Sequence, residues 1–158
     1  MSNSAKTETI RRRALVPKED CPLALAAEIL GDRWTLLILR EAFYGVQRYD
    51  DMRADLGAPR SMLTDRLGKL VERGLMTRRP YREPGSRTRD AYVLTEAGRA
   101  LALTLLALTQ WGEAHVLQGP APVEIFETAT GRPLRVELVD EDGQVVDLRA
   151  AGLRKRES

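Results

Sequence analysis

The chain has 158 residues, of which 43% are hydrophobic and 30% are charged, and its formal net charge is +2. This length fits one ordinary domain with an appendage, and the composition argues against wholesale disorder. No run approaches the roughly 18 apolar residues of a membrane span, and residues 1–18 lack a secretory signal. One cysteine and one histidine exclude an internal disulfide and a Cys/His zinc site. We therefore expect a cytoplasmic protein without a membrane partner, a metal or a cofactor.

The first 45 residues predict a tail and two helices. Residues 1–20 are polar, contain three consecutive arginines at positions 11–13 and show no apolar periodicity, so we expect a flexible tail. A helix is expected from Pro22 to Leu30, because proline is favoured in a first turn and Gly31 is a natural stop. Asp32 is the expected N-cap of a second helix that ends at Gly45. Its predicted core residues are Trp34, Leu37, Ile38 and Phe43.

A helix-turn-helix pattern follows. A short helix over residues 49–56 has Tyr49, Met52 and Leu56 on its predicted buried face. After the connection at residues 57–59, a helix over residues 59–73 has a leucine stripe at helical spacing. Two helices joined by a turn of about three or four residues, the second of them basic, are typical of a DNA-reading motif.

The pattern changes from helix to strand after Gly74. Residues 75–79 and 91–94 predict two strands, and Pro80, Pro84 and Gly85 mark the loop between them. This hairpin is a predicted wing beside the helix-turn-helix. Thr95 is the expected N-cap of a last helix that runs from Glu96 to about Val116.

The last helix has no charged residue between positions 100 and 111. A helix that is apolar most of the way round must be buried on several sides, so we expect it to pack on a second copy of the chain. The alternative is that the C-terminal part of the same chain covers it. The residues expected at the dimer interface are Leu101, Leu105, Leu108 and Trp111.

The C-terminal residues 118–158 form a predicted appendage. After a linker at 119–122, residues 123–127, 134–139 and 144–148 resemble short strands, with turns at 130–133 and 142–143. Residues 124–147 hold seven acidic and two basic residues, which makes them poor partners for DNA. A basic tail closes the chain. The predicted organisation is thus a tail over 1–20, a winged domain over 21–117 and an acidic β-hairpin extension with a basic tail over 118–158.

Positive charge is concentrated between Pro59 and Asp90. This segment has nine basic and four acidic residues, a net charge of +5, which is the electrostatic footprint of a surface that meets phosphates. Small and polar side chains on the helix would let it enter a major groove, and wing arginines would reach flanking phosphates or a minor groove. The predicted DNA-binding residues are Arg60, Ser61, Thr64, Asp65, Arg66, Lys69, Arg82, Arg87 and Arg89.

Several of these roles have alternatives. Arg60 suits guanine or a phosphate, and Asp65 suits cytosine or an ion pair with Lys69. Taken alone, the polar helix face is equally typical of a solvated surface. Cys21 at a helix start suits a reactive thiolate or a small buried side chain. No pairing of nucleophile and base, carboxylate cleft or phosphate-binding glycine loop is evident, so we do not expect an enzyme.

The chain resembles the HxlR family of bacterial winged helix-turn-helix regulators, within the MarR-like superfamily. The resemblance rests on these blocks: 21–22, 29–40, 45, 48–49, 63–67, 72–75, 92–98 and 111–113. It implies a dimer formed through the first and last helices that binds a pseudo-palindromic operator, and a cysteine sensor at the position of Cys21. Pro59 stands where relatives commonly have a helix-capping serine.

Together these patterns predict a mainly helical α+β protein with a winged helix-turn-helix domain, a long C-terminal dimerisation helix and a small β-rich extension. We expect a homodimeric, sequence-specific transcriptional regulator, most simply a repressor, whose partners are double-stranded DNA, a second copy and an oxidant, electrophile or small ligand as effector. The alternative function is a winged module that contacts proteins and has no specific DNA target.

Overall fold

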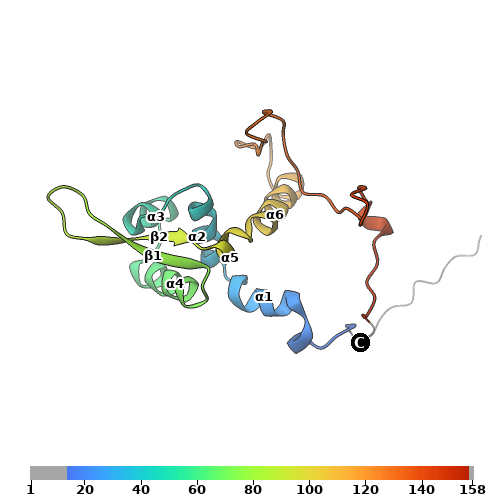
Figure 1. Cartoon of the computed structure of the whole chain (residues 1–158), viewed down its shortest axis with the longest axis horizontal. Coiled ribbons are helices and arrows are strands. Elements are labelled where there is room, and N and C mark those ends of the chain that lie inside the picture. The colour runs from blue at the N-terminus through green and yellow to red at the C-terminus, as the bar shows by residue number, and fades with distance from the viewer. Residues whose placement is uncertain (1–13, 157–158) are drawn as a thin grey trace, which may run out of the picture.

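A computed structural model describes residues 14–156, so residues 1–13 of the tail predicted over 1–20 lie outside the described part, and residues 14–20 end in a single 3-10 turn at Lys18–Asp20. Six α-helices and two strands follow one another in the order of Figure 1. They are α1 (Pro22–Leu30), α2 (Arg33–Phe43), α3 (Tyr49–Leu56), α4 (Arg60–Glu72), β1 (Met76–Tyr81), β2 (Arg89–Leu94), α5 (Glu96–Arg99) and α6 (Ala102–His115). Two single 3-10 turns, Lys18–Asp20 and Leu148–Ala150, lie outside this series.

The first four helices confirm the predicted boundaries within a residue or two. The carboxylate of Asp32 caps α2 by accepting from the backbone N–H groups of Trp34, at 3.0 Å, and Thr35, at 3.3 Å. Gly57 ends α3 in the left-handed conformation, with φ at 59°, which a residue without a Cβ adopts at little cost. The turn into α4 therefore needs glycine at this position.

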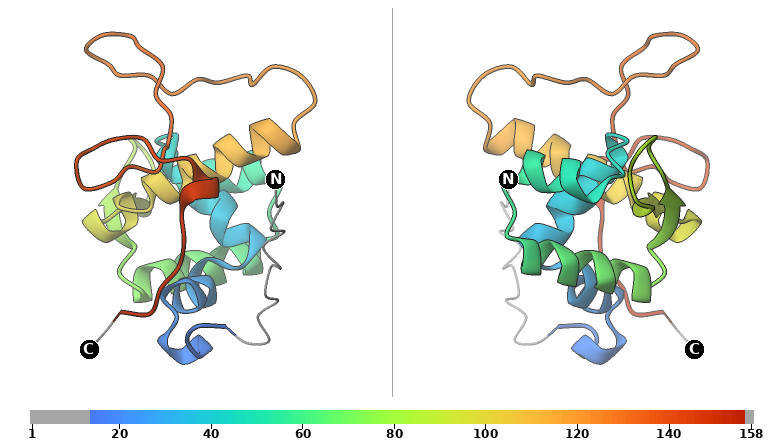
Figure 2. Two further views of the ribbon diagram at one scale, coloured as in Figure 1. Left: turned by 90° about the vertical axis from the view of Figure 1, so that its right-hand side faces the viewer. Right: turned by 90° about the vertical axis from the view of Figure 1, so that its left-hand side faces the viewer.

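The core lies where α2, α3 and α4 meet the base of the wing (Figure 2). Ile38, Met52 and the predicted leucine stripe of α4 are buried, as is Leu39, which was not among the predicted core residues. Of the four core residues predicted on α2 only Ile38 is fully buried: Trp34 and Phe43 are partly buried and pack against this cluster, and Leu37 is also only partly buried. The buried residues of this core cluster are Ile38, Leu39, Met52, Ala58, Leu63, Leu67, Leu70, Met76, Tyr92 and Leu94.

The wing is longer than predicted. β1 and β2 pair antiparallel from Met76–Leu94 out to Tyr81–Arg89. Pro80 lies within β1, which is acceptable in an edge strand because its outer side needs no ladder donor. β2 is instead flanked on its second side, since the Tyr92 N–H donates to the carbonyl of Gln47 at 2.7 Å. The segment before α3 is thereby fixed to the wing, a pairing that local sequence did not predict.

The predicted continuous helix over 96–116 is wrong in one respect, because it is broken at residues 100–101. Thr95 caps α5 as expected, accepting from the N–H of Gly98 at 3.1 Å. The next turn tightens to a bond from the Leu101 N–H to the Gly98 carbonyl, and α6 starts in a new direction. The break lets Leu101 and Leu105 pack on the core while the rest of α6 extends away from it.

Residues 118–158 are called the extension below. The three strands predicted in the extension do not form in the structure. Each predicted turn instead closes a narrow hairpin with one isolated bridge, Phe126 to Pro133 and Val139 to Val145. Backbone bonds such as that from the Leu134 N–H to the Ile125 carbonyl, at 2.7 Å, hold them. No further strand lies beside either hairpin in the described part of the chain, so no ladder can grow. Among residues 14–156 no helix is both long and apolar enough to cross a bilayer.

Candidate nucleic-acid interface

The helix-turn-helix presents one face of α4 to solvent. Its inward stripe is fully buried, whereas the opposite face carries the small and polar side chains that the sequence placed there. Because these alternate with the buried leucines at helical spacing, burying the stripe forces the polar face outward. The exposed members of the predicted set on this helix are Arg60, Ser61, Thr64, Asp65 and Lys69.

Tyr49, at the start of α3, holds the N-terminus of α4. Pro59 provides no side-chain cap for α4, but the Tyr49 hydroxyl donates to the Arg60 carbonyl at 3.0 Å. The same hydroxyl lies 3.1 Å from Oγ1 of Thr64. A phenol has one proton, so Thr64 must donate in this second bond. Thr64 therefore presents only acceptor lone pairs to a ligand, which suits a base amino group.

Asp65 and Lys69 form an ion pair across one helical turn, with Nζ 3.0 Å from the carboxylate. The hydrogen bond from Lys69 holds the pKa of Asp65 below its usual range, and the adjacent Arg66 acts in the same direction. Asp65 is therefore a carboxylate acceptor that Lys69 already occupies in the free protein. A base would have to compete with this pair.

Arg66 is placed differently from the other predicted contacts. Its guanidinium is half-buried and its Nε lies 2.7 Å from the carboxylate of Asp32, the cap of α2. Burial alone would raise the pKa of Asp32, but the hydrogen bonds from Thr35 and the Trp34 N–H and the charge of Arg66 leave that pKa lowered. Arg66 thus connects α4 to α2, and this takes up much of its capacity to contact a phosphate.

The three predicted wing arginines differ in their restraints. Arg82 donates to the Ser86 carbonyl at 3.0 Å, across the tip of the wing. Arg89 lies 2.6 Å from the carboxylate of Asp50 on α3, so it braces the wing against the helix-turn-helix. Arg87 is exposed and has no ion-pair partner among residues 14–156. It is the least restrained of the three predicted wing arginines.

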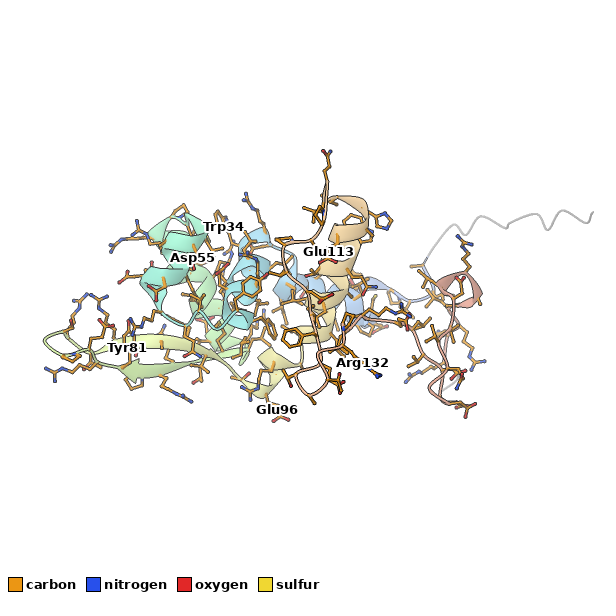
Figure 3. All side chains as sticks on the ribbon, turned by 90° about the horizontal axis from the view of Figure 1, so that it is seen from above. Trp34, Asp55, Tyr81, Glu96, Glu113 and Arg132 are labelled. Atoms are coloured by element: carbon orange, nitrogen blue, oxygen red, sulfur yellow. The ribbon has the colours of Figure 1, made fainter. Side chains whose placement is uncertain are left out.

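A polar hollow of about 360 Å³ lies between the start of α4 and the wing. It is lined by aromatic hydroxyls and charged groups of both elements: Tyr49, Asp50, Arg60, Tyr81, Arg87, Arg89, Asp90 and Tyr92. The fold therefore brings Arg60 and two of the predicted wing arginines to one surface, although they are far apart in the sequence. Figure 3 shows Tyr81 on the wing at one end of the molecule, and Glu113 of α6 and Arg132 of the extension toward the other.

Sequence reasoning missed Tyr49 and Arg48 as parts of this surface. Arg48 lies over the ring of Tyr81 at 5.0 Å and 2.6 Å from Glu83 of the wing. Tyr49 was expected only as a buried side chain, because helical periodicity predicts which face of the helix its ring lies on but not the hydrogen-bond partners of its hydroxyl. A pairing between Tyr49 and residues eleven to fifteen positions later carries no local signal.

Cys21 and the predicted dimer residues lie on the other side of the molecule. Cys21 is half-buried at the N-cap position of α1 and its thiol is free. Leu101 and Leu105 pack partly against the core of their own protomer. Leu108 and Trp111 are 49% and 58% exposed, so they are the two that remain available to another chain.

A model of the HxlR-like helix-turn-helix family matches residues 29–121, which is more than half of the chain. The chain belongs to this family. The match spans the helix-turn-helix and wing together with α5 and α6, and it ends at residue 121, within the first few residues of the extension.

Relatives of this HxlR-like protein are described as transcriptional regulators of the helix-turn-helix type. MT3179 of Mycobacterium tuberculosis is 47% identical over 97 residues, which is 61% of this chain and 60% of its own length. The chain thus matches less than two thirds of that relative. The regulator sll1512 of Synechocystis is 33% identical over 112 residues, or 65% of this chain and 82% of its own.

Solved structures divide into two groups by how much of the chain they match. PA1607, described as a candidate transcription factor, has a TM-score of 0.76 at 32% identity and covers 87% of this chain and 96% of its own. The redox regulator HypR in its reduced form has a TM-score of 0.54 at 26% identity, and the match covers 60% of this chain and 92% of HypR. Reduced YodB of Bacillus subtilis has a TM-score of 0.52 at 26% identity, and the match covers 63% of this chain and 98% of YodB.

Proposed function

We propose that this protein is a homodimeric, sequence-specific DNA-binding transcriptional regulator that represses by occupying promoter DNA in the cytoplasm. The observation that carries the proposal is the joint surface of α4 and the wing. Its exposed polar helix face adjoins Arg60, Arg87 and Arg89 around one polar hollow. Membership in a helix-turn-helix family supports DNA as the partner.

In the proposed complex α4 enters the major groove. Its first turn, with Arg60, Ser61 and Thr64, meets base edges, because the N-terminal residues of a recognition helix lie deepest. Lys69 and the wing arginines hold the backbone. Thr64, restricted to accepting, would favour adenine or cytosine amino groups.

The proposed dimer forms through the exposed faces of α1 and α6. Leu23 of α1 is 79% exposed and Leu103 of α6 is 67% exposed, and exposed apolar surface of this kind marks an interaction site. Two-fold pairing of these helices would place two copies of α4 at half-sites about one helical turn apart on a pseudo-palindromic operator.

The proposed trigger is oxidation or alkylation of Cys21, or binding of a small ligand. The observation that favours Cys21 is its place at the start of α1, inside the proposed dimer contact, so that a modified thiol would alter the pairing of the protomers. The structural neighbours HypR and YodB include forms described as reduced. A Cys21→Ser variant that releases DNA as readily as the wild-type protein when an oxidant is added would contradict this trigger.

The DNA proposal is tested by selecting bound sequences from random duplexes and titrating the best site at several salt concentrations. Arg87→Ala should weaken binding on every sequence and reduce the slope of log K against log salt by about 0.9, the loss of one phosphate contact. Arg135→Ala, an exposed arginine of the extension, is the matched control and should leave the slope unchanged. No enriched sequence and no salt dependence would instead favour a module that contacts proteins.

A further inference from the structure

The extension is almost entirely exposed, although it is rich in apolar side chains. Backbone bonds give it a definite shape: the Glu127 N–H donates to the Arg132 carbonyl at 2.8 Å and the Val146 N–H to the Leu138 carbonyl at 2.8 Å. Both hairpin loops nevertheless project away from the helices (Figure 2). The exposed large apolar side chains of the extension are Val123, Ile125, Phe126, Leu134, Leu138, Val139, Val145, Leu148 and Leu153.

One side chain fixes the extension to its own protomer. The amide of Gln110 on α6 donates to the Val136 carbonyl at 3.1 Å and accepts from the Val136 N–H at 2.9 Å. This pair replaces the bonds that a neighbouring strand would make. It holds the middle of the extension beside α6 without covering the helix, because Trp111 is still 58% exposed.

The total exposed area shows how much surface is left without a partner. The chain exposes 13515 Å². A compact protein of 17.7 kDa exposes about 7,900 Å². Residues 1–13 and 157–158, even if fully extended, account for at most about 2,400 Å². The surplus is roughly 3,000 Å² per copy, or about 6,000 Å² for two copies, which reaches the upper part of the range that permanent homodimers bury in total.

The extension is a built element and not a stray tail. PA1607 matches 87% of this chain, whereas residues 1–117 make up only about three quarters of it, so the match must include part of the extension. HypR covers only 60% of this chain, which is about the length of the family domain alone. Part of the extension therefore has a structural counterpart in another solved protein.

We propose that the extension of each protomer packs across α1 and α6 of a second copy of the chain, so that the two copies exchange arms about their two-fold axis. This inference rests on the homodimer of the proposed function. Each copy carries both halves of the contact, the apolar extension and the bare helices, and an isologous pairing satisfies both at once. The charge of −5 on residues 124–147 keeps the extension away from bound DNA, and the wing lies at the opposite end of the molecule (Figure 3).

The first experiment mixes unlabelled and ¹⁵N-labelled full-length protein and links nearby carboxylates with a dihydrazide. Exchanged arms predict linked peptides of mixed isotope that join Glu137 or Asp140 of one copy to Glu28 or Glu113 of the other. If every such link is between peptides of one isotope while sedimentation shows a dimer, the exchange is wrong and the dimer stands. Sedimentation as a monomer at all concentrations would overturn both the exchange of arms and the proposed dimer.

A second experiment uses a substitution that cannot unfold the domain, because its site is exposed in a single protomer. Phe126→Ser should raise the dimer dissociation constant at least tenfold, since the ring is 52% exposed within one copy and buried only in the exchanged dimer. Thr128→Ser, two residues along the same hairpin, is the control and should leave the constant unchanged. An unchanged constant for Phe126→Ser would overturn the proposal.

Discussion

The hydroxyl of Tyr49 shows how a single polar atom can organise the start of a helix. Pro59 begins α4 without a side-chain cap, so the first turn of α4 has lost a partner that a serine would have supplied. Tyr49 reaches across the turn and fixes both Arg60 and Thr64 instead. In the proposed complex, the two residues that would meet bases are therefore positioned before DNA arrives.

Tyr49→Phe removes these two hydrogen bonds and leaves the ring packed. We expect operator affinity to fall about three- to tenfold, the effect of one or two neutral hydrogen bonds, with an unchanged salt slope because no charge is lost. Fluorescence anisotropy at several salt concentrations measures both quantities. Tyr44→Phe, on an exposed tyrosine beneath Arg40, is the control. Wild-type affinity in Tyr49→Phe would show that the bonds do not position the helix.

Asp32 couples the stability of the domain to pH. Its lowered pKa in the folded state means that the carboxylate stabilises the fold above its ordinary value of about 4, and that this contribution is lost as pH falls through the lowered value. Asp32→Ala should cost about 1–2 kcal/mol at pH 6, from the lost cap of α2 and the ion pair with Arg66. Urea unfolding should show the difference from wild type shrinking below pH 4. A difference that stays constant down to pH 3 would contradict this assignment.

At the scale of elements, the break between α5 and α6 decides which apolar residues face inward. The uncharged stretch predicted one helix, whereas the chain breaks it at residues 100–101, and Leu101 and Leu105 pack on the core. Gly98 of α5 lies close to the backbone before the break, because a Cβ at this position would lie 2.1 Å from the Leu75 carbonyl oxygen. Glycine therefore lets α5 pack directly against the start of the wing.

Gly98→Ala should destabilise the domain by about 1–3 kcal/mol, because the contacted atom is backbone and cannot rotate away. Thermal or urea unfolding of the two proteins measures this. Gly68→Ala on α4 is the matched control: nothing lies within 4 Å of its added Cβ, so alanine should stabilise the helix by up to about 1 kcal/mol. Equal stability of the two variants would show that the close approach at Gly98 is relaxed in solution.

At the scale of the whole molecule, one protomer leaves a large part of its apolar surface uncovered. α1 and α6 project from the domain that carries the wing, and the extension runs past them without covering them (Figure 1). The sequence left open whether a second copy or the chain's own C-terminal part covers the last helix. The exposure of Leu103 and Trp111 favours a second copy.

Trp111→Ser should weaken the proposed dimer at least about 30-fold, the usual effect of removing a buried interface tryptophan. Sedimentation equilibrium measures the dissociation constant, and operator affinity should fall with it because two half-sites are no longer bound together. Glu96→Ser, an exposed change on α5 outside the proposed contact, should have little effect. A Trp111→Ser protein that dimerises like wild type would exclude this face.

Local patterns in the sequence were enough to predict the first four helices, the cap at Asp32, the leucine stripe of α4 and the existence of the wing, because each depends on neighbours a few residues apart. The break at residues 100–101, the pairing of β2 with Gln47 and the bonds of Tyr49 were decided only by the tertiary structure. Each of them joins segments that are distant in the chain, or trades local helix continuity for packing on the core. The same reason explains the extension, whose alternating residues favour strands but whose protomer provides no further strand within residues 14–156 to complete a sheet.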